Sequence, residues 1–164
     1  MTTLSRGPGV VHRAVVETRL GAFALVASGA GLRSLVPLGA RGDSPEGEPG
    51  HAPLAAAAAA LRAYCAGDPA PYRGALDPSG SEFQFRVWRR LLAIPFGAQV
   101  TYGEIAADLG NPGEARAVGA AVAANPIAIL VPCHRLVGAG GTLRGYAWGL
   151  DLKRRLLAHE LRLF

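Results

Sequence analysis

The side chains best suited to covalent chemistry lie together in Val131-Pro132-Cys133-His134-Arg135. A thiol is a weak nucleophile until its pKa falls, and an imidazole or a guanidinium beside it has that effect. Pro132 restricts the backbone and favours extended geometry at Val131. The pattern therefore predicts the end of a strand, following the apolar residues 127–130, that presents Cys133 as an ionised and accessible thiolate.

A single cysteine is more often an inert core residue, because free Cys is among the most frequently buried residue types. The neighbours of Cys133 and the glycines at 138, 140 and 141 favour a reactive thiol instead. Cys65 has no histidine or metal-ligand spacing around it, so we expect it to be structural. Two cysteines give no disulfide framework, which is typical of a reducing compartment, and we expect a cytoplasmic protein.

The first 80 residues predict a small sheet and one helix. Three strands separated by short turns form a β-meander, an Ala-rich helix follows a loop, and a Pro-rich connector ends the region. The expected ranges are Val10–Glu17, Ala22–Ala27 and Leu32–Leu38 for the strands, 39–53 for an exposed mobile loop, Pro53–Cys65 for the helix and 68–80 for the connector. We therefore expect two domains, 1–80 and 81–164.

Two capping boxes predict where helices begin in the second half. Ser81 pairs with Gln84 before a helix that runs to about Ala93, with its aromatic and aliphatic stripe facing a core. Thr101 pairs with Glu104 before a helix over 102–109.

A third helix is predicted from about Glu114 to Ala124, after a Gly-Asn-Pro-Gly turn. Two short helices across a tight turn are typical of a helix-turn-helix, although helical hairpins are common. This helix is built almost entirely of small residues, so its backbone can approach a partner closely or pack tightly in a core. Arg116 lies in its first turn, where the interaction of a positive charge with the helix dipole is unfavourable by ~0.3–1 kcal/mol. This placement suggests that the side chain binds a ligand.

Bulk composition favours a folded protein with a polyanionic partner. Apolar residues make up 50% of the chain and charged residues 18%, which excludes global disorder. The formal charge is +5; residues 81–164 hold 10 Lys+Arg against 6 Asp+Glu, and residues 1–80 hold 7 against 6. The excess in the second half suggests nucleic acid. We expect no membrane span and, from the mixed stretch after Arg6, no signal peptide.

The second half closely resembles the O6-alkylguanine-DNA alkyltransferases. The resemblance covers residues 81–164, and the first half fits the family only in outline. It is carried, in order and spacing, by Ile94–Gly97, Thr101–Ala106, Arg116–Gly119, Asn125–Arg135, Gly145–Leu150, Lys153 and Leu156–Glu160.

The resemblance implies an α+β protein with a ribonuclease-H-like N-terminal antiparallel sheet and helix. Its C-terminal helical domain would be of the winged-helix type and carry the helix-turn-helix and Cys133. It implies removal of alkyl groups, chiefly methyl, from O6 of guanine and less readily from O4 of thymine in duplex DNA. The group moves irreversibly and stoichiometrically to Cys133 after base flipping. We expect a monomer that can cluster cooperatively on DNA, with no cofactor and no metal.

The resemblance also assigns catalytic roles to five residues. Cys133 is the nucleophile, His134 accepts the thiol proton through a water, and Glu160 orients the imidazole. The three would act as a catalytic triad of nucleophile, base and orienting group. Tyr102 protonates N3 of the leaving guanine, and Asn125 braces the turn before Cys133. The bland alternatives are a packing residue for Tyr102, a helix-terminal Asn for Asn125 and a solvated acid for Glu160.

The remaining implied residues contact DNA or the damaged base. Small residues of the third helix would enter the minor groove, which is only about 6 Å wide, with Arg116 filling the gap left by the everted base. Ala147 stands where some relatives carry Ser, and Trp148 where others carry Gly, so we expect large alkyl groups to react less well. The DNA-contacting set is Thr101, Arg116, Ala117, Gly119, Ala120 and Arg135, and the pocket set is Pro132, Leu136, Tyr146, Ala147, Trp148 and Lys153.

Three other functions remain open at the level of sequence. A non-catalytic sensor of alkylated bases would lack the cysteine that this chain has. A cysteine hydrolase could use Cys133, His134 and Glu160, but it would need an oxyanion hole and turnover. A helix-turn-helix transcription factor would bind specific sequences without transferring any group.

Overall fold

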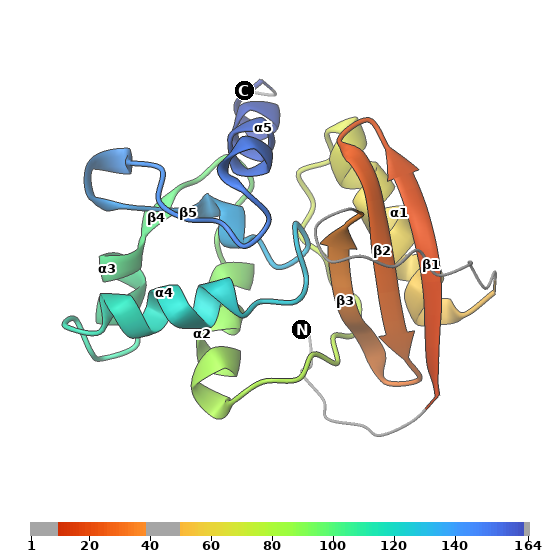
Figure 1. Ribbon diagram of the computed structural model, residues 1–164, viewed down its shortest axis with the longest axis horizontal. Helices are drawn as coiled ribbons and strands as arrows, with labels where there is room; N and C mark the ends of the chain where they lie inside the picture. The colour runs from red at the N-terminus through yellow and green to blue at the C-terminus, as the bar shows by residue number, and fades with distance from the viewer. Residues whose placement is uncertain (1–9, 39–49, 163–164) are drawn as a thin grey trace. The chain divides into compact units, whose positions relative to one another are not determined.

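The computed structural model describes residues 10–38 and 50–162, and its elements are shown in chain order in Figure 1. Most of the predicted loop at 39–53 and the N-terminal stretch containing Arg6 lie outside the described residues. The chain forms two compact units. The first comprises the described residues up to Ser79 together with Pro126–Leu130, and the second comprises Gly80–Asn125 and the residues from Val131 onward. A single division at residue 80 does not anticipate that exchange.

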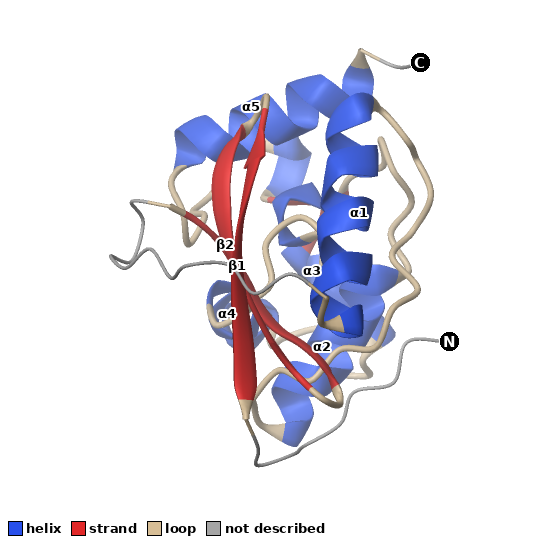
Figure 2. Cartoon of the chain, turned by 90° about the vertical axis from the view of Figure 1, so that its right-hand side faces the viewer, coloured by secondary structure: helices blue, strands red, loops and turns tan. Residues whose placement is uncertain are grey.

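The first unit holds a three-stranded antiparallel sheet, as the turn pattern predicts. Strands β1 (Val11–Thr18), β2 (Gly21–Ser28) and β3 (Gly31–Pro37) lie in that order. Helix α1 (Ala52–Ala66) lies along one face of the sheet (Figure 2). It ends at Gly67, whose φ of 103° is a conformation that favours glycine.

The outer edge of β3 is covered by two separate segments. Leu32 exchanges backbone hydrogen bonds with Ala75 and Asp77, and Leu35 exchanges them with Pro126 and Ala128. The second pairing is what joins Pro126–Leu130 to the first unit. The apolar residues 127–130 are therefore buried next to the sheet but form only an isolated bridge, not the regular strand that the sequence predicts.

The second unit begins with α2 (Glu82–Leu92), and the predicted capping box of Ser81 with Gln84 is present. Phe85, Val87, Trp88 and Leu91 are buried, which confirms the core-facing stripe. The indole N–H of Trp88 donates to the carbonyl of Ala121 at 2.8 Å. This bond fixes α2 against the helix that carries the small residues.

The helices of the predicted helix-turn-helix are α3 (Tyr102–Asp108) and α4 (Ala115–Ala123). The second capping box, of Thr101 with Glu104, starts α3. Short strands β4 (Val100–Thr101) and β5 (Leu136–Val137) pair in parallel. The 3-10 turn η1 (Cys133–Arg135) precedes β5, and a second one, η2 (Ala139–Gly141), follows it. Helix α5 (Leu150–Leu161) completes the unit. Among the described residues, no helix has the length and apolar character needed to cross a membrane.

Candidate active site

Cys133 opens the 3-10 turn η1 and is buried, with 1% of its surface exposed. The predicted strand end and accessible thiolate are therefore both wrong for this structure. Burial raises the pKa of the thiol to about 11, outweighing hydrogen bonds with Asn125 and Tyr146 and the charge of Lys153, which lower it. The thiol is thus protonated at neutral pH.

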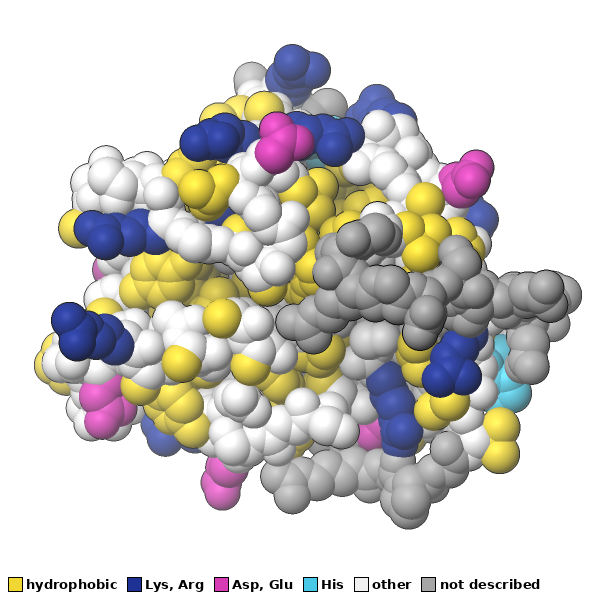
Figure 3. Space-filling view, in the orientation of Figure 1, with side chains coloured by type: hydrophobic (Ala, Val, Ile, Leu, Met, Phe, Trp, Pro, Cys, Tyr) yellow, Lys and Arg dark blue, Asp and Glu magenta, His cyan; other side chains and the backbone are white. Residues whose placement is uncertain are grey.

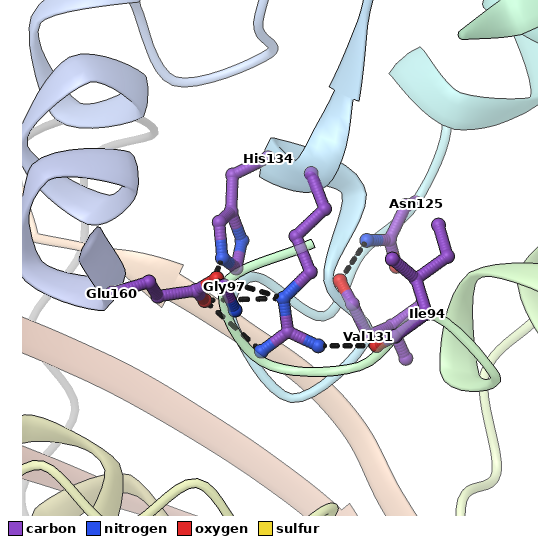
Figure 4. Close-up of polar contacts among 7 residues, drawn as sticks. Ile94, Gly97, Asn125, Val131, His134 and Glu160 are labelled. Atoms are coloured by element: carbon purple, nitrogen blue, oxygen red, sulfur yellow. Dashed lines mark hydrogen bonds and ion pairs between the residues drawn. The ribbon is translucent and has the colours of Figure 1, made fainter. Parts of the chain in front are cut away.

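The two neighbours expected to activate the thiol interact with Glu160 instead (Figure 4). His134 Nε2 lies 2.6 Å from Glu160 Oε1. Arg135 donates to both carboxylate oxygens at 3.0–3.1 Å, and its Nη1 donates to the carbonyl of Ile94 at 2.6 Å. The assignment of Arg135 to DNA binding is wrong, because its guanidinium is already hydrogen-bonded to Glu160 and Ile94 and the residue is only 8% exposed.

Glu160 is the centre of this network, as the resemblance implies, and it is not a solvated acid. The backbone N–H of Gly97 donates to its second oxygen at 2.9 Å. Burial favours the neutral acid, but hydrogen bonds and charge from His134 and Arg135 prevail and lower the pKa of Glu160 to about 2. Burial also lowers the pKa of His134, against the influence of Glu160. At neutral pH the site therefore holds an ionised carboxylate beside a neutral imidazole, which can accept a proton; the charge of His134 acts on Glu160 only in acid.

The low pKa of Glu160 predicts a loss of stability in acid. Because the folded-state pKa of about 2 lies below the ordinary 4.5, the contribution is complete above pH 4.5 and disappears as the pH falls toward 2. The shift corresponds to about 3 kcal/mol of unfolding free energy. Urea titrations across this window should show a falling midpoint in the wild type and a much flatter one in Glu160→Gln; equal slopes would contradict the assignment.

Asn125 follows the end of α4 and braces the turn before the cysteine. Its Nδ2 donates to the carbonyl of Val131 at 3.1 Å, and the residue is buried. The amide also contributes to the hydrogen bonding of the Cys133 thiol. One side chain thereby holds both the backbone two residues before the thiol and the thiol itself.

Lys153 lies on α5 and is fully buried. Its Nζ donates to the carbonyl of Arg144 at 2.9 Å and to that of Gly145 at 3.4 Å, and it lies 5.9 Å from the ring centroid of Tyr102. Burial lowers the pKa of Lys153, while the nearby Cys133 raises it. Lys153 therefore ties the loop before α5 to the helix and adds positive potential near the thiol.

A groove of about 980 Å³ opens in the second unit beside this network. Its walls come from the start of α3, from α4 and from the loop around η2. Six of the predicted site residues line it: Thr101, Tyr102, Arg116, Gly119, Tyr146 and Ala147. Figure 3 shows hydrophobic surface in a hollow on the left of the view, with Lys or Arg side chains above and below it.

The other predicted residues lie outside the groove lining. Ala117 and Ala120 are exposed on α4, whereas Pro132 and Leu136 are buried, as are Cys133 and Lys153. Trp148 meets Tyr146 edge to face, with ring centroids 5.3 Å apart. The indole therefore bears on the pocket through Tyr146, not directly.

Three residues of the site are absent from the sequence-based set. Gly97 and Ile94 contribute only backbone atoms, which residue type does not reveal. Arg144 lines the groove, and its position in a Gly-rich loop is the one signal that could have identified it. Within residues 10–38 and 50–162, no cluster of three or more His, Cys, Asp or Glu side chains could hold a metal ion.

Comparison with known proteins places the chain in a known family. Residues 82–162 match the family model described as the DNA-binding domain of 6-O-methylguanine DNA methyltransferase. The methylated-DNA–protein-cysteine methyltransferase of Mycolicibacterium paratuberculosis is 56% identical over 109 residues, 66% of each chain. Its counterpart from Mycobacterium bovis is 54% identical over 61% of each. The matched segments thus span somewhat under two thirds of these relatives.

Solved structures extend the likeness to nearly the whole chain. The Mycobacterium tuberculosis O6-methylguanine methyltransferase superposes with a TM-score of 0.83 at 41% identity, covering 94% of this chain and 95% of that one. The Mycobacterium tuberculosis OGT in complex with DNA has a TM-score of 0.83 at 42% identity, covering 93% and 94%. The mixed α/β fold, with its three-stranded antiparallel sheet, is common to them. This chain belongs to the O6-methylguanine-DNA methyltransferase family.

Proposed function

We propose that this chain repairs O6-alkylguanine, chiefly O6-methylguanine, in duplex DNA by moving the alkyl group to Sγ of its own Cys133, once per molecule. The observation that carries the proposal is the buried Cys133 followed directly by the His134–Glu160 pair. This arrangement lies in the unit that the family model matches. O4-alkylthymine is a poorer substrate of the same reaction.

DNA binds along α4. Ala117 and Ala120 are exposed there, and Gly119 lines the groove, so the helix backbone can enter a minor groove about 6 Å wide. Arg116 fills the space that the everted nucleotide leaves and recovers part of the unstacking cost of a few kcal/mol. Thr101, at the start of α3, contacts the DNA backbone.

The everted base occupies the groove. Tyr102 reaches N3 of the guanine, the backbone N–H of Ala147 donates to O6, and Tyr146 lines the space for the alkyl group. The burial of Cys133 means that docking of the nucleotide must open the path to the sulfur.

The transfer is a displacement at the alkyl carbon. The Sγ–carbon bond forms as the carbon–O6 bond breaks, the thiol proton passes through water to neutral His134, and Tyr102 gives a proton to N3 of the leaving guanine. Glu160 stabilises the imidazolium that results, and Arg135 holds Glu160 in place. Because the thiol pKa is raised, deprotonation accompanies attack and does not precede it.

The finer features of the fold belong to the same proposal. The second unit is a winged-helix-type domain in which α3 and α4 form the helix-turn-helix, and the sheet of the first unit is of the ribonuclease-H type. The division of labour follows residues 1–80 and 81–164, with DNA binding and transfer in the second part. The protein acts as a monomer in the cytoplasm and clusters cooperatively along DNA.

Mass spectrometry after incubation with a methylated duplex tests the proposal. A gain of one methyl group per protein, on the peptide containing Cys133, with no further reaction in excess duplex, supports it. Continuous release of product would identify a hydrolase, and binding without a mass change would identify a sensor. Preference for one undamaged sequence would identify a transcription factor.

Trp148 predicts a preference for small alkyl groups. We expect slower transfer from O6-benzylguanine than from O6-methylguanine in the same duplex, because the indole holds Tyr146 in the pocket wall. Trp148→Ala should raise the benzyl-to-methyl rate ratio roughly two- to tenfold, since an aromatic pair contributes about 0.5–1.5 kcal/mol. Single-turnover rates measure this, and comparable wild-type rates for the two groups would refute it.

A further inference from the structure

Two arginines line the groove of the second unit, Arg116 on α4 and Arg144 in the loop between η2 and α5. Most of the other lining residues are small or apolar. The acidic exception, Glu104, accepts the backbone N–H of Thr101 through one carboxylate oxygen. In the part of the chain that the structure describes, neither arginine forms an ion pair. The groove therefore carries two cations that form no ion pair with a carboxylate of the described residues.

The backbone at Arg144 is held in place by hydrogen bonds from Lys153. Buried Lys153 donates to its carbonyl at 2.9 Å and to that of the next residue, Gly145. A loop rich in glycine is otherwise free to adopt many conformations. The two bonds fix the point from which the Arg144 side chain leaves the loop.

The stem of the Arg144 side chain passes over Gly138. A Cβ added at Gly138 would collide with Oγ1 of Thr142 and would lie 2.8 Å from Cγ and 3.0 Å from Nε of Arg144. Glycine is required there for space, and the aliphatic stem packs on bare backbone. The guanidinium thus leaves the loop along the backbone of Gly138 and remains exposed at the groove, where a ligand can reach it.

We infer that Arg144 binds a backbone phosphate of the strand that carries the everted nucleotide, at the groove that Arg116 also lines. A planar guanidinium that forms no ion pair within residues 10–38 and 50–162 suits bidentate binding of phosphate. The inference rests on the proposed function. It makes Arg144 a positioning residue, because it holds the nucleotide and does not touch the reacting atoms.

Salt-dependent binding tests this. The duplex carries O6-methylguanine, and Cys133→Ser protein keeps it unreacted. Adding Arg144→Gln, which keeps the stem over Gly138, should weaken binding roughly tenfold. It should also make the slope of log K against log salt shallower by about 1. Arg144→Lys should keep most of the slope, and Arg89→Gln, at an exposed position outside the groove lining, should change neither value.

A second readout separates phosphate binding from support of the loop. With Cys133 intact, Arg144→Gln should slow methyl transfer from the duplex but not from free O6-methylguanine base, which has no phosphate. An unchanged salt slope, or an equal loss with both substrates, would overturn the inference. If the wild type transfers no methyl group from either substrate, the proposed function fails, whatever the salt slope shows.

Discussion

Cys133→Ser is expected to abolish methyl transfer from a damaged duplex, so that the mass of the protein does not increase. A hydroxyl in the same buried position is a far weaker nucleophile than sulfur, and neutral His134 cannot ionise it at a useful rate. The variant should retain its affinity for duplex DNA, because the groove lining does not include Cys133. Intact-mass spectra and gel-shift titrations measure the two properties.

Cys65→Ser is the matched control for that experiment. Cys65 is the chain's other cysteine and is also buried, but it lies in the first unit near the end of α1. Its removal should leave one methyl group per protein at the wild-type rate. Transfer that survives in Cys133→Ser and disappears in Cys65→Ser would identify Cys65 as the acceptor and would refute the proposal.

Glu160→Ala is expected to lower the free energy of unfolding by about 3–5 kcal/mol, because it leaves a buried arginine without its counter-charge. Arg135 loses its bonds to both carboxylate oxygens, and the backbone N–H of Gly97 loses its acceptor. Transfer by the molecules that remain folded should also fall steeply, since the imidazole loses the group that orients it. Urea unfolding and single-turnover rates measure the two effects.

The control for Glu160 is an exposed pair of the same chemistry. Arg90 and Asp108 form an ion pair on the surface of the second unit, with side chains 40% and 47% exposed. Asp108→Ala should cost only about 0–1 kcal/mol, because water screens such pairs. Similar losses in Glu160→Ala and Asp108→Ala would show that the network around Glu160 is less desolvated than its geometry indicates.

Features that depend on local hydrogen bonding could be predicted from sequence. The two capping boxes place the starts of α2 and α3 correctly, because a Ser or Thr and a residue three positions on satisfy the same backbone groups in any context. The three strands of the first unit follow in the same way from their turns. The match of motifs with a known family supplied the partners of the cysteine.

Features that depend on distant contacts could not be predicted. The sequence places Arg135 beside the thiol, but only the fold brings Glu160 close enough to engage it. The pairing of Leu35 with Pro126 likewise joins segments about 90 residues apart and draws residues 126–130 into the first unit. Cys133 is buried by the fold, and this burial raises the pKa of its thiol despite the cationic neighbours in the sequence.

Lys153 is the only lysine in the sequence, and it is wholly enclosed. Every cationic side chain that reaches the solvent is therefore an arginine, or a histidine when protonated, and the arginines keep their charge at any pH at which the fold survives. A lysine-specific protease has a single cleavage point, which it can reach only in molecules whose last helix has opened. Its digestion rate thus reports that opening equilibrium directly, without any label or engineered site.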